Sequence, residues 1–210
     1  MNKLLLLLVF SALVLSQQLV FAQHQKLAQQ EEWIVKINEN TQSIKSLTAD
    51  FEQMKNMSFL DEAVVSKGKF WFKEPEQIRW EYQSPYNYIM IMSKGVLIVK
   101  DEGDEYSTDL SSNKIFEQMN GLISGSIQGK LLDNDQDYSK EYYEDTEHII
   151  IRLLPKDSHL SAYLDYMELW FNKLDLQVDV LLMHEPSGDY TEMKFYNRKM
   201  NPLISADVFE

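Results

Sequence analysis

Apolar and polar residues alternate most regularly between Val65 and Lys100, where they form four short runs. The alternation has a period of two, which is typical of strands with one buried face and one face in water. Tight turns are expected between the runs, so the pattern predicts four antiparallel strands. The turns are Glu74-Pro75-Glu76, Ser84-Pro85-Tyr86 and Ser93-Lys94-Gly95. In the first two runs the apolar face carries Gly68, Phe70, Phe72, Ile78, Trp80 and Tyr82.

The flanking segments predict a helix before this region and more strands after it. Apolar residues spaced by three and seven predict a helix from Lys26 to about Thr48, and Leu47–Met54 alternates like a strand. A short strand is expected near Tyr106, and one or two short amphipathic helices between Asn113 and Leu132. Further strands are expected near Tyr142 and over His148–Leu154, Tyr163–Asn172, Gln177–His184 and Asp189–Asn197, with a last edge at Val208-Phe209.

Alternation also predicts which side of a later strand faces the interior. In the run from Gln177 to His184, it places Val178, Val180 and Leu182 on the inner face.

Glycines recur at every fourth position of the helical insertion, and each one costs about 1 kcal/mol relative to alanine in a helix. We therefore expect this insertion to be marginally helical and rich in hinges. The glycines are Gly121, Gly125 and Gly129.

These elements together predict an α+β fold with one helix, about five strands, a weak helical insertion and about five more strands. An antiparallel sheet of this size must curl on itself, and the two helical segments are available to cover its open side. The sequence contains no internal repeat and no linker, so residues 23–210 are expected to form one domain.

The N-terminus has the pattern of a secretory signal peptide over residues 1–22, with Lys3, the apolar run Leu4–Leu15 and the small residue Ala22. A membrane anchor is the alternative interpretation, but the apolar run is too short to span a bilayer.

The chain has no cysteine, so an exported domain would depend on its core for stability and would lack the acyl-bearing residue of a lipoprotein. The formal net charge of −13 disfavours binding to nucleic acid or to anionic membranes.

Catalytic and cofactor motifs give little support to an enzyme. The sequence has no Gly-x-Ser-x-Gly elbow, no cysteine nucleophile and no histidine pair with zinc-site spacing. Its histidines, which we interpret as surface or structural residues, are His24, His148, His159 and His184. We expect no cofactor.

One acidic segment has the ligand spacing of a calcium loop. Asp133-Asn134-Asp135-Gln136-Asp137, with Glu144, places oxygen ligands at positions one, three, five and twelve. Tyr138 stands at position six, where such loops need glycine for their sharp turn. A solvated acidic loop is therefore the preferred interpretation, and calcium binding stays an open alternative.

The aromatic content of 12% and the ten methionines are compatible with two interiors. One is a well-filled core, and the other is a cavity for an apolar ligand. A long curled sheet can have more inner surface than two helical segments fill. A cover weakened by glycines could open for a ligand, and methionine side chains adapt to irregular cargo.

Several ordered motifs resemble the outer-membrane lipoprotein carrier family, LolA. The first block is Phe51-Glu52-Gln53, then Lys67-Gly68-Lys69-Phe70-Trp71-Phe72-Lys73-Glu74-Pro75, then Ile78-Arg79-Trp80-Glu81-Tyr82-Gln83-Ser84-Pro85. The second is Leu154-Pro155-Lys156, then Gly188-Asp189-Tyr190-Thr191-Glu192-Met193-Lys194-Phe195, and the terminal Val208-Phe209. The resemblance covers essentially the whole chain after the signal peptide.

The resemblance implies an incomplete β-barrel closed by helices, located in the periplasm. It also implies a monomeric carrier that takes lipoprotein acyl chains from an inner-membrane, ATP-driven releasing complex to an outer-membrane receptor. The family pattern often has an arginine before the proline of the first block, where it helps to hold the helical lid. Glu74 occupies this position here, so a different latch is expected. Lys73 and Arg79 are the nearest cations, but alternation places both on the outer face.

The leading hypothesis is therefore a periplasmic carrier with an apolar cavity. Its predicted lining residues are Phe51, Phe70, Phe72, Ile78, Trp80, Tyr82, Ile89 and Ile91. Its predicted lid residues are Ile115, Phe116, Met119, Leu122 and Ile123. The alternatives are a lipid-sensing or regulatory binding module on the same fold, and an enzyme acting on a lipid, for which no nucleophile or acid–base pair can be named.

Overall fold

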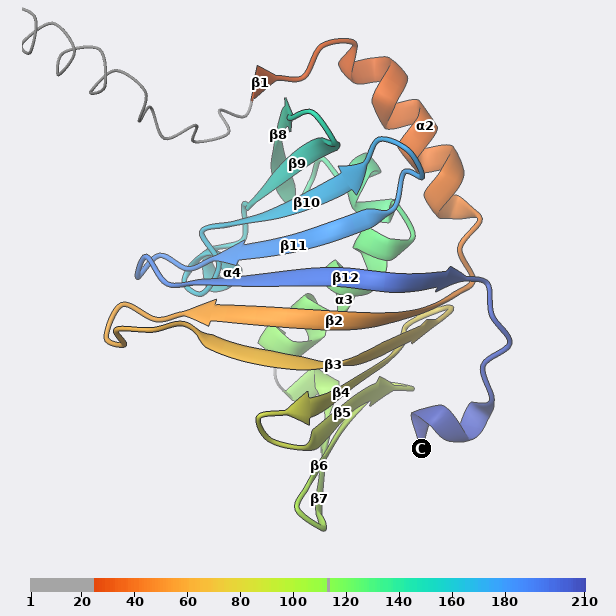
Figure 1. The fold of residues 1–210 in the computed structure, drawn as a ribbon, viewed down its shortest axis with the longest axis vertical. Helices are drawn as coiled ribbons and strands as arrows, with labels where there is room; N and C mark the ends of the chain where they lie inside the picture. Colours follow the sequence, from red (N-terminus) through yellow and green to blue (C-terminus); the bar gives the residue numbers. More distant parts are fainter. Residues whose placement is uncertain (1–24, 113) are drawn as a thin grey trace, which may run out of the picture.

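The computed structural model describes residues 25–112 and 114–210, so the predicted signal peptide lies outside the described residues. Twelve antiparallel strands form one curled sheet, and helix α3 (Lys114–Ile127) lies on its concave side (Figure 1). Helix α2 (Gln30–Gln42) crosses one end of the sheet. The strands are β1 (Gln25–Lys26), β2 (Ser46–Asn56), β3 (Val64–Lys73), β4 (Gln77–Ser84), β5 (Tyr88–Ser93), β6 (Val96–Asp101), β7 (Asp104–Asp109), β8 (Tyr138–Glu144), β9 (His148–Pro155), β10 (Tyr166–Asn172), β11 (Val178–His184) and β12 (Tyr190–Met200).

The sheet is open, because its order β1-β8-β9-β10-β11-β12-β2-β3-β4-β5-β6-β7 ends in two edge strands within the described residues. The chain completes one half of the sheet, inserts the helical segment, and then completes the other half. Pairing of β12 with β2 joins the halves from Tyr190 opposite Asn56 to Met200 opposite Leu47. This topology confirms the predicted α+β fold with a curled antiparallel sheet that is covered by helices.

Four short helical segments complete the fold, namely η1 (Leu110–Ser112), η2 (Lys130–Asp133), α4 (Ser158–Ser161) and η3 (Ala206–Phe209). Within the described part of the chain, no helix combines the length and the apolar character needed to cross a membrane.

The sequence pattern located the strands well and the first helix less well. The four runs between Val65 and Lys100 are β3 to β6, and the weak strand near Tyr106 is β7. The predicted helix from Lys26 to Thr48 is shorter, because the chain turns after Gln42 and Leu47 already pairs with Phe72 in the sheet. The position of Leu47 fits both the helical spacing and the alternation of the following strand, and the structure places it in the strand.

The predicted inner face of β11 is wrong at two positions. Leu181 lies opposite Leu169, and both belong to the core, whereas Val180 lies opposite Trp170 on the other face. The register shifts between Trp170 and Phe171, so that Phe171 faces Val178. This β-bulge adds one residue to β11 and reverses its alternation beyond Val178, which places Leu182 outside with Val180.

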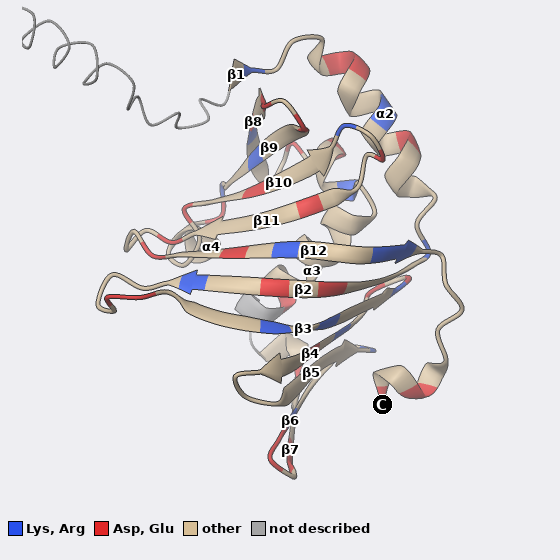
Figure 2. Ribbon diagram, viewed as in Figure 1, with Lys and Arg blue, Asp and Glu red and all other residues tan. Residues whose placement is uncertain are grey.

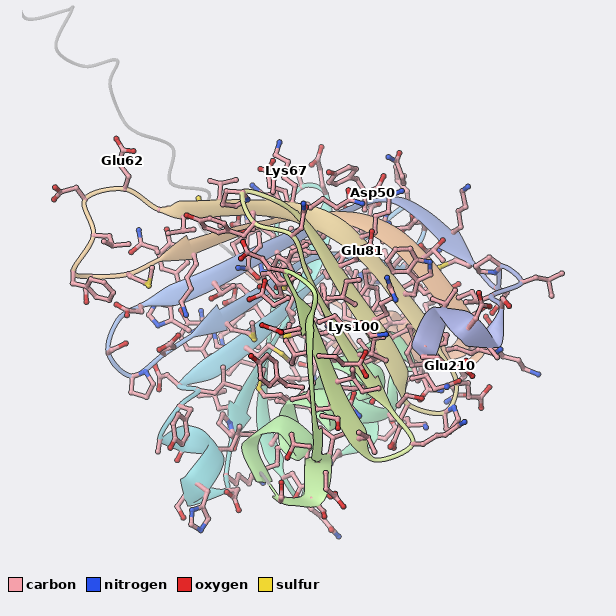
Figure 3. All side chains as sticks on the ribbon, turned by 90° about the horizontal axis from the view of Figure 1, so that it is seen from below. Asp50, Glu62, Lys67, Glu81, Lys100 and Glu210 are labelled. Atoms are coloured by element: carbon pink, nitrogen blue, oxygen red, sulfur yellow. The ribbon has the colours of Figure 1, made fainter. Side chains whose placement is uncertain are left out.

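The C-terminal segment does not form the predicted edge strand at Val208-Phe209. It forms the short helix η3, which packs against β4 and β5 on the outer side of the sheet. Side-chain cations of three strands hold its backbone: Lys73 Nζ donates to Ile204 O at 3.1 Å, Arg79 Nη1 to Val208 O at 3.2 Å, and Lys100 Nζ to Glu210 O at 3.0 Å. Figure 3 shows Lys100 beside the terminal Glu210.

Charged residues of both signs are spread along the strands (Figure 2). Some of them pair on the outer face, as Lys67 and Glu52 do at 2.8 Å. The inner face is aromatic where β2, β3 and β4 meet. A Cβ atom at Gly68 would lie 2.1 Å from the carbonyl oxygen of Glu81 and 2.8 Å from the Phe51 ring. Glycine at this position therefore allows the Phe51 ring to pack directly over the sheet.

Candidate functional site: an apolar cavity under the helices

A small apolar cavity of about 60 Å³ lies between the helices and the sheet. Its wall is formed by the end of α2, the second half of α3 and strands β2, β3, β10, β11 and β12. The apolar lining residues are Ile44, Leu47, Phe70, Ile123, Ile127, Leu169, Val178, Leu181, Phe195 and Met200. The polar lining residues are Thr41, Ser126, Gln177 and Arg198.

Of the predicted lining residues, only Phe70 reaches this cavity. Its neighbours form a filled aromatic core: the Phe70 and Trp80 rings lie 4.3 Å apart between centroids, and the Phe51 and Trp80 rings 5.1 Å apart. Tyr82 stacks on Tyr88 at 4.2 Å. The predicted residues that are buried in this core are Phe51, Phe72, Ile78, Trp80 and Tyr82. They therefore belong to the core beside the cavity and do not line it.

Ile89 and Ile91 lie on the opposite face from the one predicted. Ile91 pairs with Arg79 and Ile89 with Glu81, which are residues of the outer face. Met90 and Met92 occupy the inner face, opposite Trp80 and Ile78. Every residue from Tyr88 to Met92 is apolar or aromatic, so alternation could not fix the phase of this strand. Ile91 is nevertheless fully buried, in the region of β5 that η3 covers.

The predicted lid is helix α3, and its apolar side faces the interior. Leu122 is fully buried, Met119 packs against the core, and Ile123 lines the cavity. The side chains of Ile115 and Phe116 are outside the described residues. Gly121 and Gly125, where the sequence predicts hinges, lie inside one continuous helix, since α3 runs without a break to Ile127. Burial of one side of this helix outweighs the propensity cost of its glycines.

The cover is held where α3 ends against α2. Gly129 has a φ of 71°, and a Cβ atom there would lie 2.1 Å from Thr41 Oγ1 and 3.1 Å from Thr41 Cβ. Only glycine combines this left-handed conformation with so close an approach. Asn38 Nδ2 also donates to Asp133 Oδ1 at 3.1 Å, which ties η2 to α2.

A buried lysine fixes the other side of η2. The Lys140 side chain is only 4% exposed, and its Nζ donates to Leu132 O at 2.5 Å and to Asp135 Oδ1 at 2.7 Å. This hydrogen bond lowers the pKa of Asp135, which keeps the carboxylate ionised and bound to Lys140. The latch therefore joins β8 to η2, far in sequence from Glu74.

The family model for outer membrane lipoprotein carrier protein LolA matches residues 42–210 of this chain. The chain belongs to this family. The outer-membrane lipoprotein carrier protein of Xanthomonas oryzae pv. oryzae is 27% identical over 170 residues, covering 80% of this chain and 78% of that protein. The carrier of Xanthomonas axonopodis pv. citri is 26% identical with the same coverage. The solved structure of a LolA superfamily protein from Nitrosomonas europaea is 12% identical, with a TM-score of 0.48 over 88% of this chain and 98% of that one.

As a LolA-family protein this chain departs from the expected latch. Glu74 is exposed, and the neighbouring cations Lys73 and Arg79 bind the C-terminal segment on the outer face. Thr41, Gly129 and Lys140 hold the cover instead. No sequence pattern marks these three residues as a group, because Thr41 lies far in sequence from Gly129 and Lys140 and meets Gly129 only in the folded chain.

Arg198, the cationic residue of the cavity lining, is paired with two carboxylates. Arg198 lies 2.9 Å from Asp175 Oδ2 and 2.5 Å from Asp179 Oδ1. Asp179 Oδ2 also accepts from Asn172 Nδ2 at 2.8 Å and lies 3.2 Å from His148 Nε2. This network fixes the bulged part of β11 and the end of β12. Sequence alternation placed Val178 of this wall on the inner face but missed Leu181, because the bulge reverses the alternation beyond Val178.

The acidic segment considered for calcium is engaged in other contacts. Asp133 accepts from Asn38, Asp135 binds Lys140, and Glu144 Oε2 accepts from Lys173 at 2.8 Å. Within residues 25–112 and 114–210, no group of three or more histidine, aspartate or glutamate side chains is arranged to hold a metal ion. The described residues thus lend the calcium alternative no support.

Replacing Gly129 by alanine should destabilise the protein by about 2 kcal/mol, through the left-handed backbone and the clash with Thr41. Urea unfolding measures this change. Combining Gly129→Ala with Thr41→Ala removes the clashing oxygen, so the double variant should be more stable than the sum of the two single effects predicts. Strictly additive effects would contradict the direct contact between these residues.

Proposed function

We propose that this LolA-family protein is a periplasmic carrier that holds the acyl chains of lipoproteins under its helical cover and shuttles them from the inner to the outer membrane. An apolar cavity whose wall combines the cover helices with the sheet carries this proposal. Burial contributes about 0.8 kcal/mol per methylene, so an acyl chain needs no specific polar partner to be held.

The cavity in this form is closed to such cargo. Its volume of about 60 Å³ is well below the roughly 150 Å³ of an apolar cavity that binds benzene. Acyl chains therefore require α2 and α3 to move apart, since both helices contribute to the wall. Methionines at the wall and on the cover, such as Met119 and Met200, can repack around chains of different shape.

The partners of this cycle are an inner-membrane lipoprotein-releasing complex and an outer-membrane receptor. Both partners, and export with removal of residues 1–22, belong to the proposal. Export is tested by N-terminal sequencing of the periplasmic protein, which should begin at Gln23.

Acyl-dependent capture is the decisive test of the carrier function. The purified carrier is mixed with a lipoprotein in one sample. In a second sample it is mixed with a variant of that lipoprotein whose acyl-bearing cysteine is replaced by serine. Native mass spectrometry should detect a one-to-one complex with the acylated form alone. Equal capture of both forms, or of neither, would exclude the carrier function.

The same sample separates a carrier from the two alternatives. A carrier should release intact cargo to acceptor membranes that contain the receptor, so the mass of the lipoprotein is unchanged after transfer. A lipid-sensing module would retain its ligand, and an enzyme would change the mass of the ligand.

A further inference from the structure

A groove of about 550 Å³ lies beside the first half of α3 and shares no residue with the apolar cavity. Its walls come from the β3–β4 turn, the β5–β6 turn and η1, with α3 along one side. Its volume falls within the range of about 300–1,000 Å³ that is usual for ligand sites. The residues that distinguish it are Gln77, Ser93, Asp109, Glu117, Asn120 and Gly121.

Asn120 lines this groove and is only 6% exposed. Its Oδ1 atom is buried and finds no hydrogen-bond donor among the residues that the structure describes. A buried amide oxygen without a donor costs stability, and an N–H group from an occupant would satisfy it. The groove thus offers an acceptor that the protein itself leaves unused.

A donor lies on the other side of the same groove. Ser93 is 8% exposed, and its Oγ accepts from Gln77 Nε2 at 2.9 Å. The serine hydroxyl keeps its own hydrogen for donation after accepting this bond. One unused acceptor and one available donor match the N–H and C=O groups of an extended peptide.

The charges of the groove restrict the occupant further. Its lining includes the carboxylates of Glu76, Asp109 and Glu117 and one ammonium group, that of Lys94. This balance repels the phosphate of a lipid head group and favours a neutral or basic segment.

The groove and the cavity lie along the same helix. Asn120 precedes Ile123, which lines the cavity, by three positions, or less than one helical turn. An acylated molecule with its chains beneath the second half of α3 would therefore bring its polar part to the groove.

We propose that this groove holds the extended peptide segment next to the acylated residue of the cargo. This inference rests on the proposed carrier function and assigns the peptide part of the lipoprotein to its own site. Affinity for cargo then has two separable contributions, from the acyl chains in the cavity and from the first peptide groups in the groove.

Gly121 provides a way to fill the groove without disturbing the fold, because a Cβ atom there would meet nothing within 4 Å. Gly121→Leu places a side chain in the groove, and Gly121→Ala is the matched control for helix propensity. A second variant, Asn120→Leu, removes the unused acceptor while keeping the side chain close in size.

Two probes are compared by isothermal titration: palmitoyl amide, and a palmitoylated peptide of four neutral residues. Gly121→Leu and Asn120→Leu should weaken binding of the lipopeptide about fivefold and leave palmitoyl amide unchanged, whereas Gly121→Ala should resemble wild type. Asn120→Leu should also raise the melting temperature of the unliganded protein.

The other possible results contradict either the peptide site alone or the carrier function as well. Equal binding of the two probes by wild type, or equal losses for both probes in Gly121→Leu, removes the peptide site but leaves the carrier function intact. If wild type binds neither probe, the carrier function fails, and the peptide site fails with it.

Discussion

Oxidation of the double variant Thr41→Cys/Gly129→Cys should abolish loading with acyl chains, and reduction should restore it. The two positions join α2 to the end of α3, and both helices contribute to the wall of the cavity. A disulfide between them keeps the cavity near its closed volume of about 60 Å³, which is too small for an acyl chain. The affinity for a fluorescent acyl probe should fall at least about 100-fold on oxidation, since the population of the open form limits binding.

The geometry of this pair suits a disulfide. A Cβ atom at position 129 would lie 3.1 Å from Thr41 Cβ. A disulfide needs about 3.5–4.5 Å between Cβ atoms, so a displacement of less than 1 Å is sufficient. The wild-type chain has no cysteine, so no other disulfide can form within the chain and oxidant alone should leave wild type unaffected.

Two controls decide the interpretation. The single variant Gly129→Cys reports the cost of a side chain in the left-handed conformation, without a link between the helices. The double variant under reducing conditions reports the cost of both substitutions. Full loading of the oxidised double variant would show that the cavity opens without separating α2 from α3 at Gly129.

The sequence predicted the strands and the aromatic core because these features are local and periodic. Phe70 and Trp80 were placed on the inner face, since charged residues alternate with them and fix the phase. Such alternation is missing in β5, where Ile89 and Ile91 could be exchanged with Met90 and Met92 without changing the pattern. The ambiguity was thus a property of the amino-acid sequence itself.

The cavity could not be predicted in the same way, because its wall depends on long-range packing. The bulge between β10 and β11 selects Leu181 for the interior in place of Val180, and no turn residue marks it in the sequence. The close approach of Gly129 and Thr41 joins two segments that are 88 positions apart in the chain (129 − 41). The sequence predicts a hinge at Gly129, but the contact of Gly129 with Thr41 depends on the packing of α2.

The position of the cavity also changes which substitutions test the function. Trp80 is buried in the filled core, so truncating it should destabilise the protein by about 3–5 kcal/mol and says little about cargo. Residues of the cavity wall are more informative, because the adjacent space can accept additional atoms.

Val178→Phe should fill the cavity and reduce the affinity for an acyl probe about tenfold or more, while keeping the fold intact. Val178 lines the cavity from the bulged strand, and the ring occupies the space into which the first methylenes of an acyl chain would pack. Filling about 60 Å³ at about 24 cal/mol per Å³ raises the free energy of unfolding by at most about 1.4 kcal/mol.

Leu182→Phe is the matched control for this variant, because Leu182 lies on the same strand and faces outward opposite Glu168. This substitution also introduces a phenyl ring on β11, but the ring lies outside the cavity. The Leu182→Phe protein should therefore bind the acyl probe with the affinity of wild type. Probe titration and urea unfolding of both variants provide the measurement. A stable Val178→Phe protein that binds the probe like wild type would place the acyl chains elsewhere, because a cavity already filled by a phenyl ring cannot be where they begin to enter.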